Sequence, residues 1–183
     1  FYDMKGIVEH LMSVLGMTLG KYCASEDVVI GTAMSGRTLE EQSSMIGMFV
    51  NTLPIRMKPA GDMRLKDYVV QTAQTIRTVK ANQTYPFEHL VPMLAPDRNA
   101  SRSPVFDVIF NYLQEQPLPT LEDAQASYVP IKGQALQMDL VLIATHEGPN
   151  MKFVLSYSRK LYDDAVAENF MEQFLTTLER CCE

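Results

Sequence analysis

The sequence predicts an α/β fold in which a mixed β-sheet is covered by helices. Stretches with apolar residues at helical spacing are interspersed with short β-like runs along the whole chain. Two β-like runs near the C-terminus flank a strong turn signal, Glu147–Asn150, which indicates an antiparallel hairpin. Helices mixed with such a hairpin are typical of a mixed sheet with helices packed against it.

Length and composition describe a globular chain. Its 183 residues suffice for one compact domain with a hydrophobic core. A net charge of −6 with scattered basic residues argues against a nucleic-acid partner. No apolar run approaches the roughly 20 residues that cross a bilayer, and no secretion signal is present, so we expect a cytoplasmic protein with no membrane partner.

The N-terminal half is expected to alternate helices and strands. Residues 3–24 and 64–81 carry an apolar stripe at helical spacing, which predicts two amphipathic helices. A short buried strand is expected at 28–30 and a longer one at 46–56. A short apolar helix is expected at 87–94, after a break in the pattern.

The C-terminal half is expected to contain most of the sheet. Strands are predicted at 106–112, 128–131, 138–145 and 151–158, and a helix begins near Asp164. In the first of these strands the polar Asp107 and Asn111 share one face with Ile109. Residues 115–126 have little periodicity, so they are expected to form an exposed excursion.

Asn51 occupies an unusual position in the predicted strand 46–56. In an extended chain Asn51 shares one face with Phe49, Leu53 and Ile55. Burying an unpaired amide costs roughly 2–7 kcal/mol. Asn51 must therefore either be hydrogen-bonded by the fold or face a passage lined by water or ligand.

No motif for catalysis or metal binding is evident. The three histidines stand apart from one another and from cysteine: His10, His89 and His146. The three cysteines form neither a metal-binding spacing nor a disulfide framework: Cys23, Cys181 and Cys182. A nucleophile elbow of the GxSxG type is also absent. We therefore expect no metal site and no catalytic group in this chain.

Three segments together resemble condensation domains of nonribosomal peptide synthetases. Ile46–Arg56 (IGMFVNTLPIR) resembles the IGxFVNTxxxR motif of that family. Asn82–Glu88 (NQTYPFE) resembles (H/N)QDYPFE, and Arg98–Val105 (RNASRSPV) resembles RDxSRNPL. The segments follow the family's order and spacing, and the similarity extends over nearly the whole chain.

The chain also departs from the family pattern. Thr84 and Asn99 replace aspartates and Ser103 replaces an asparagine, which puts salt bridges of the nearby arginines in doubt. The family's HHxxxDG motif, whose second histidine is assigned to amide formation, has no counterpart here. The resemblance therefore implies that residues 1–183 are the C-terminal lobe of a condensation domain, inactive alone and without a catalytic residue.

The resemblance also implies an architecture and partners. Two lobes of the chloramphenicol acetyltransferase-like α/β sandwich fold form a V around a tunnel. Donor and acceptor peptidyl carrier proteins bring substrates on phosphopantetheine, so this chain is expected to bind no cofactor directly. Its other partner is the N-terminal lobe, and residues 115–137 are the candidate latch that bridges to it.

Site residues follow from the same resemblance. The candidates for the wall of the substrate tunnel are Asn51, Thr52 and Phe49. The arginines expected to be structural or to face a carrier protein are Arg37, Arg56, Arg98 and Arg102.

Two other interpretations stay open. One is a noncatalytic condensation-like domain that recruits carrier or tailoring proteins, which a degenerate HHxxxDG motif upstream would favour. The other is a lobe of an epimerisation domain, because Phe110–Leu113 (FNYL) resembles that subfamily's FNYLG. The FVNT stretch argues against it, since a GWFT-type run is expected there.

Overall fold

The computed structural model describes residues 4–94, 103–114, 138–148 and 150–182, with a few separate positions between 118 and 136. In chain order the elements are α1 (Met4–Tyr22), β1 (Val28–Met34), the 3₁₀ helix η1 (Glu40–Ser44), β2 (Asn51–Met57), α2 (Leu65–Ala81), α3 (Phe87–Leu94), β3 (Val108–Gln114), β4 (Leu140–Glu147), β5 (Asn150–Tyr157) and α4 (Asp164–Cys182). None of the helices in the described part could span a membrane.

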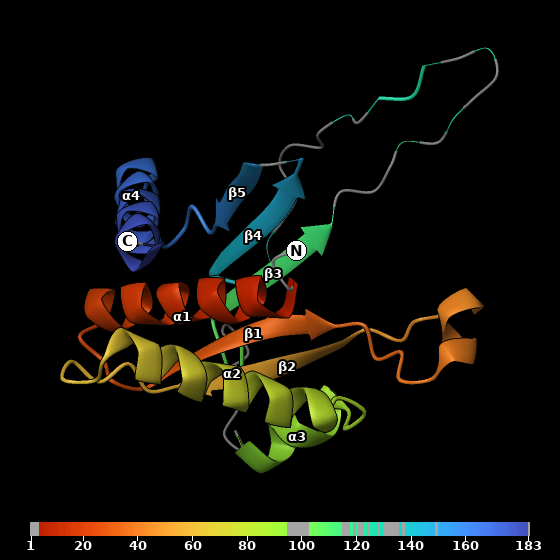
Figure 1. The fold of residues 1–183 in the computed structure, drawn as a ribbon, viewed down its shortest axis with the longest axis horizontal. Coiled ribbons are helices and arrows are strands. Elements are labelled where there is room, and N and C mark those ends of the chain that lie inside the picture. Colours follow the sequence, from red (N-terminus) through yellow and green to blue (C-terminus); the bar gives the residue numbers. More distant parts are fainter. Residues whose placement is uncertain are drawn as a thin grey trace.

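The strands form one mixed sheet in the order β2-β1-β3-β4-β5 (Figure 1). β1 pairs antiparallel with β2 and parallel with β3. β4 pairs parallel with β3 and antiparallel with β5, so the predicted hairpin is present. Helix α1 contacts both α2 and α4, and the three helices lie against the strands β1, β2 and β5. The predicted mixed sheet with a helical layer is confirmed.

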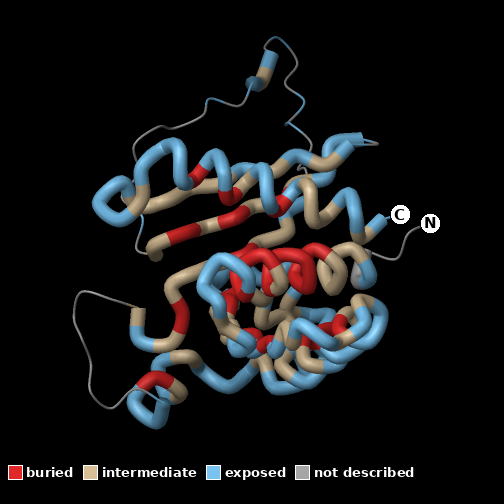
Figure 2. Tube along the Cα trace, turned by 90° about the vertical axis from the view of Figure 1, so that its left-hand side faces the viewer, coloured by how far each residue is buried: buried red, intermediate tan, exposed pale blue. Residues whose placement is uncertain are grey.

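Helix α1 lies at the centre of the hydrophobic core. Four of its apolar side chains are at most 2% exposed: Leu11, Met12, Val14 and Leu15. They pack with strand side chains that are fully buried: Ile30, Ile55, Phe110 and Leu142. Figure 2 shows these buried residues (red) concentrated in a central helical stretch and the strands beside it. The core therefore lies between the sheet and the three long helices.

The opposite face of the sheet has much less cover. Along β3, Phe110 faces the core, so Ile109, Asn111 and Leu113 face the other way, and Leu113 is 49% exposed. Phe106, which precedes β3, packs on this second face at Gly31 of β1. The result is an α/β sandwich with one helical face and one partly open face.

Most predicted elements are confirmed; β3, β4 and β5 are shifted by one or two residues from the predicted bounds, and β1 and β2 differ more. Helices α2, α3 and α4 begin within one residue of the predicted positions. The predicted strand 46–56 is wrong over 46–50, because β1 ends at Met34, which pairs with Asn51 and leaves the earlier residues without a partner strand. β1 runs over seven residues rather than three because β2 supplies a partner for each. The predicted strand 128–131 lies almost wholly outside the described residues.

Tyr68 of α2 gives the core a pH-dependent contribution. Gly16 lets α1 approach it closely, since an added Cβ at Gly16 would lie 2.5 Å from the Tyr68 hydroxyl oxygen. Burial raises the pKa of Tyr68 from 10.0 to about 12, while the nearby Thr72 hydroxyl opposes this shift. Because the folded state favours the neutral phenol, the contribution of Tyr68 to the unfolding free energy is fully present below pH 10. This contribution is lost as the pH rises from 10 towards 12.

We therefore expect wild-type protein to lose about 1.4 kcal/mol more of its unfolding free energy than Tyr68→Phe between pH 9 and pH 11. The phenylalanine ring fills the same space but cannot ionise. Urea unfolding of both proteins at the two pH values measures the difference. Parallel losses in both proteins would show that Tyr68 does not titrate differently on folding.

Candidate functional site

The side-chain amide of Asn51 is hydrogen-bonded by the fold. Its Nδ2 donates to the carbonyl oxygens of Gln83 (2.9 Å) and Tyr85 (2.7 Å). The Phe87 backbone N–H donates to Asn51 Oδ1 at 3.3 Å. Because two carbonyls need a donor and an N–H needs an acceptor, these partners fix the orientation of the amide. Both Asn51 N–H groups are occupied.

This hydrogen bonding brings the motif segments together. Asn51 belongs to the segment 46–56 and its three partners belong to the segment 82–88. Phe87 begins α3, so Asn51 Oδ1 satisfies an N–H that a helix start leaves unpaired. The Phe87 ring lies 5.4 Å from that of Phe106, which directly follows the segment 98–105. Asn51 thus links the first two segments, and the Phe87 ring connects them to the residue that follows the third.

Arg37 and Phe49 close the base of a protruding arm, defined here as residues 35–50. The Arg37 guanidinium lies 4.2 Å above the centre of the Phe49 ring and donates to the Gln42 carbonyl oxygen. Gly36 has φ of +66°, and an added Cβ would collide with the Phe49 carbonyl. Arg37 therefore stabilises the arm's own conformation, and Phe49 is half-buried beneath it.

The arm projects beyond the end of the sheet (Figure 1). Several of its apolar side chains are exposed to solvent. Ile46 is fully exposed and Met48 is 89% exposed. The Gln42 side chain accepts hydrogen bonds from the backbone N–H groups of Thr38 and Leu39, so the arm is internally ordered. Ordered, exposed apolar side chains are characteristic of a surface that contacts another protein segment.

Arg56 forms an exposed ion pair at the other end of β2. Its Nε lies 2.8 Å from Asp27 Oδ1 and its Nη2 lies 2.5 Å from Oδ2. The hydrogen bond from Arg56 holds the pKa of Asp27 below its ordinary value, and Asp27 raises the pKa of Arg56. Both side chains are solvent-exposed, so the pair contributes little to stability.

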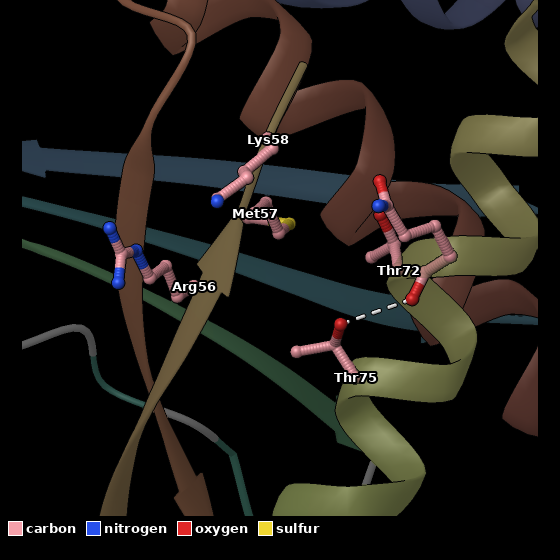
Figure 3. A pocket seen from close by; sticks show the side chains of 6 residues that line it. Arg56, Met57, Lys58, Thr72 and Thr75 are labelled. Atoms are coloured by element: carbon pink, nitrogen blue, oxygen red, sulfur yellow. Dashed lines mark hydrogen bonds between the residues drawn. The ribbon is translucent and has the colours of Figure 1, made fainter. Parts of the chain in front are cut away.

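A pocket of about 260 Å³ lies beside this ion pair, between the end of β2 and α2 (Figure 3). Its lining consists of Arg56, Met57, Lys58, Gln71, Thr72 and Thr75. The Thr75 hydroxyl donates to the Gln71 carbonyl oxygen at 3.1 Å. Among these described lining residues there is no carboxylate, histidine or thiol.

The other predicted site residues have different surroundings. Thr52 is half-buried on β2, where it pairs with Ala33 of β1. Arg98 and Arg102 lie outside the described residues. Among the described residues no group of three His, Cys, Asp or Glu side chains could hold a metal. Within the same part of the chain no histidine pairs with a carboxylate, so no acid–base pair is assembled.

Asn111 is a residue whose role the sequence pattern did not reveal. Its Oδ1 accepts a hydrogen bond from the Ala33 backbone N–H at 3.1 Å, across the junction of β1 and β3. The pattern marked Asn111 only as a polar residue in an apolar strand. Its contact joins positions 78 residues apart, which no local spacing indicates.

Comparison with known proteins identifies the family. The model of the condensation domain family matches residues 6–183. Gramicidin S synthase 2 of Brevibacillus brevis is 33% identical over 177 residues, which cover 94% of this chain and 4% of that protein. Bacitracin synthase 1 of Bacillus licheniformis is 30% identical over 181 residues, which cover 97% of this chain and 3% of that protein.

Solved structures share the fold. The X-domain in its complex with OxyB from teicoplanin biosynthesis has a TM-score of 0.83 at 25% identity, covering 97% of this chain and 39% of that chain. A four-domain nonribosomal peptide synthetase bound to AMP and glycine has a TM-score of 0.85 at 23% identity, and the match covers 94% of this chain and 14% of that chain.

This chain spans only 3 to 7% of the length of the curated relatives it matches. Those relatives include the synthases of gramicidin S, tyrocidine, bacitracin and surfactin, which are nonribosomal peptide synthetases. Since the family model spans residues 6–183, this chain belongs to the condensation domain family of nonribosomal peptide synthetases.

Proposed function

We propose that this chain is the C-terminal lobe of a condensation domain that joins a carrier-bound aminoacyl or peptidyl thioester to an acceptor amine. The observation that carries this proposal is the meeting of the motif segments at Asn51 and Phe87, within a family match over residues 6–183. The absence of an HHxxxDG sequence among the 183 residues supports the assignment to one lobe only.

The reaction defines what this lobe has to supply. The acceptor nitrogen attacks the thioester carbonyl, a C–N bond forms, the C–S bond breaks, and the amine proton passes to the departing thiolate. A group of the other lobe handles that proton, since the described part of this chain contains no acid–base pair. This lobe contributes one wall of the tunnel, with Phe49 and Thr52 beside the fixed Asn51.

The substrates arrive on phosphopantetheine carried by donor and acceptor peptidyl carrier proteins, so this lobe needs no bound cofactor. The arm supports a contact with the N-terminal lobe, because it is internally ordered and exposes Ile46 and Met48. The candidate latch, residues 115–137, lies mostly outside the described residues. We assign it to the same contact because it is a long segment of little periodicity that directly follows β3 in the sequence.

We expect replacement of residues 115–137 by a glycine–serine linker of equal length to weaken binding of the separately produced N-terminal lobe by at least about tenfold, because loss of about 1.4 kcal/mol of contact energy has that effect. The replacement leaves this lobe folded, since the linker is long enough to run from the end of β3 back to the start of the parallel β4 and the core between the sheet and α1 is not touched. Calorimetric titration measures the affinity, and circular dichroism checks the fold. Unchanged affinity would remove the latch assignment.

Reconstitution of the complete domain tests the proposed activity. Donor and acceptor carrier proteins loaded with aminoacyl pantetheine are mixed with it, and the amide product is detected by mass spectrometry. We expect product from the complete domain and none from the chain of residues 1–183. Product formed by that chain alone, or none formed by a folded complete domain with an intact HHxxxDG motif, would contradict the proposal.

A second candidate is a noncatalytic domain that recruits a partner protein. The observation that favours it is the similarity to the X-domain, which was solved in complex with OxyB. A degenerate HHxxxDG motif upstream, together with tight binding of a tailoring enzyme, would support recruitment. The epimerisation alternative rests only on Phe110–Leu113, and the product's stereochemistry distinguishes it from condensation.

A further inference from the structure

The junction of β1 and β3 is the weakest seam of the sheet. These parallel strands are paired at a single position, Gly31 with Ile109. On its other side β3 is paired with β4 over all seven residues. Beyond Gly31 the Asn111 side chain, rather than a strand carbonyl, accepts the hydrogen bond from the Ala33 N–H. The two strands therefore separate towards their carboxyl ends, and Asn111 bridges the gap.

This seam is also the topological switch point of the sheet. After β1 the chain turns to β2 on one side, and after β3 it turns to β4 on the other. In open α/β sheets, ligands bind outside the carboxyl ends of the strands at such a switch point. Ala33 is the second-last residue of β1, so the bridge to Asn111 lies at that end.

The Asn111 side-chain amide has N–H groups that are free to bind a ligand at this end of the seam. The Ala33 N–H can only be paired with an oxygen, so the bond fixes Oδ1 towards β1 and leaves Nδ2 on the other side. Within the described residues Nδ2 has no hydrogen-bond partner. Asn111 lies on the partly open face of the sheet, opposite the buried Phe110. Its neighbours on that face are uncharged: Ile109, Leu113 and, on β4, Ile143.

We propose that Asn111 Nδ2 donates a hydrogen bond to an amide carbonyl of the carrier-tethered substrate and positions it along the β1–β3 seam. The inference rests on the proposed function. A neutral donor among apolar side chains suits a neutral acceptor flanked by aliphatic groups. Secondary amides of this kind occur in the pantetheine arm and in a peptidyl group, and both present the same carbonyl.

Two variants separate binding from structure. Asn111→Asp keeps a side-chain oxygen that accepts from the Ala33 N–H but removes the two N–H donors. Asn111→Leu removes the oxygen as well as the donors. In the complete domain we expect Asn111→Asp to retain its melting temperature and to raise the KM for an acyl thioester about tenfold, as the loss of one hydrogen bond does. Asn111→Leu raises KM similarly and also lowers the melting temperature, because the seam loses its bridge.

Substrate analogues identify which amide is bound. The wild-type domain is compared on an N-acetylcysteamine thioester and on a pentyl thioester without that amide, then on an acyl group with and without an internal amide. For the wild-type domain, kcat/KM is about tenfold lower with the analogue that lacks the bound amide than with its amide-containing counterpart. For Asn111→Asp, kcat/KM is the same with both compounds, because the contact is already lost. Equal losses in both proteins for every analogue would overturn the contact and leave Asn111 as a bridge within the sheet.

Failure of the proposed function is distinguishable from failure of this inference. If the unaltered complete domain forms no amide, the contact is tested by binding instead. The side-chain NH₂ resonances of Asn111 are followed by nuclear magnetic resonance while pantetheine, and separately a short N-acyl dipeptide, is added. A shift with either probe that is absent in Asn111→Asp supports the contact, and no shift with both overturns it.

Discussion

Replacing Asn51 by leucine is expected to lower the unfolding free energy by about 2–4 kcal/mol. Leucine has a similar size but leaves the carbonyls of Gln83 and Tyr85 and the N–H of Phe87 without their partner. Part of this loss is recovered by water, since the site is only partly buried. Urea unfolding of both proteins measures the change.

Thr52→Val is the matched control for Asn51→Leu. It changes the neighbouring residue on the same strand to an isosteric apolar one, and the Thr52 hydroxyl makes no hydrogen bond within the described residues. We expect a change within about 0.5 kcal/mol. A loss as large as that of Asn51→Leu would mean that the strand end, rather than the Asn51 amide, is sensitive to substitution.

A different substitution, Asn51→Ala, tests whether Asn51 acts in catalysis. A donor that stabilises the transition state typically contributes about 10²–10³ in kcat. The Asn51 donors are already bonded to Gln83 and Tyr85, so we expect Asn51→Ala in the complete domain to lower kcat by less than about tenfold at temperatures where the variant stays folded. A larger loss in a fully folded variant would show that Asn51 acts directly on the reacting groups.

Sequence patterns were sufficient for the elements and for the placement of Asn51 among apolar residues. Leu53 and Ile55 on the same strand face are buried, as the alternation predicts. The pattern left two alternatives for Asn51, and the structure shows that the fold itself supplies the hydrogen bonds. Its partners lie 32 to 36 residues away, and their distance in space depends on how α2 crosses β2.

Dependence on long-range contacts also explains why the sequence did not predict the bounds of β2 or the sparse pairing of β1 with β3. Residues 46–50 have an apolar, β-like composition, but a strand also needs a partner, and β1 ends opposite Asn51. Likewise the single pairing of β1 with β3 is a property of long-range register. Local spacing can mark Asn111 as a polar residue within a strand, but it cannot show that its amide replaces a missing backbone contact.

Gly31→Ala is expected to destabilise the chain by about 2–3 kcal/mol, which is typical of overpacking in a filled site. The added Cβ would lie 2.3 to 2.7 Å from atoms of the Phe106 ring. Phe106 is only 3% exposed, and its ring packs against that of Phe87 at the start of α3. The ring therefore cannot move without shifting α3 or widening the seam at Gly31 and Ile109. Chemical unfolding measures the loss.

Phe106→Leu tests whether the destabilisation by Gly31→Ala arises from a collision with the Phe106 ring. Phe106→Leu alone removes ring contacts and destabilises the chain, but in the Gly31→Ala background it also relieves the collision. We expect the two changes to be non-additive, with the double variant more stable than their sum by about 1–2 kcal/mol. Gly61→Ala serves as the control, because an added Cβ there meets nothing within 4 Å.

If the losses in unfolding free energy of Gly31→Ala and Phe106→Leu were additive, the destabilisation by Gly31→Ala would come from the strand backbone and not from a collision with the Phe106 ring. The coupled result has a further consequence for the seam. Phe106 presses on β1 at the only residue where β1 pairs with β3. A displaced ring would therefore alter the distance that Asn111 bridges to Ala33. In the complete domain Gly31→Ala should then raise the KM for acyl thioesters while Gly61→Ala leaves it unchanged.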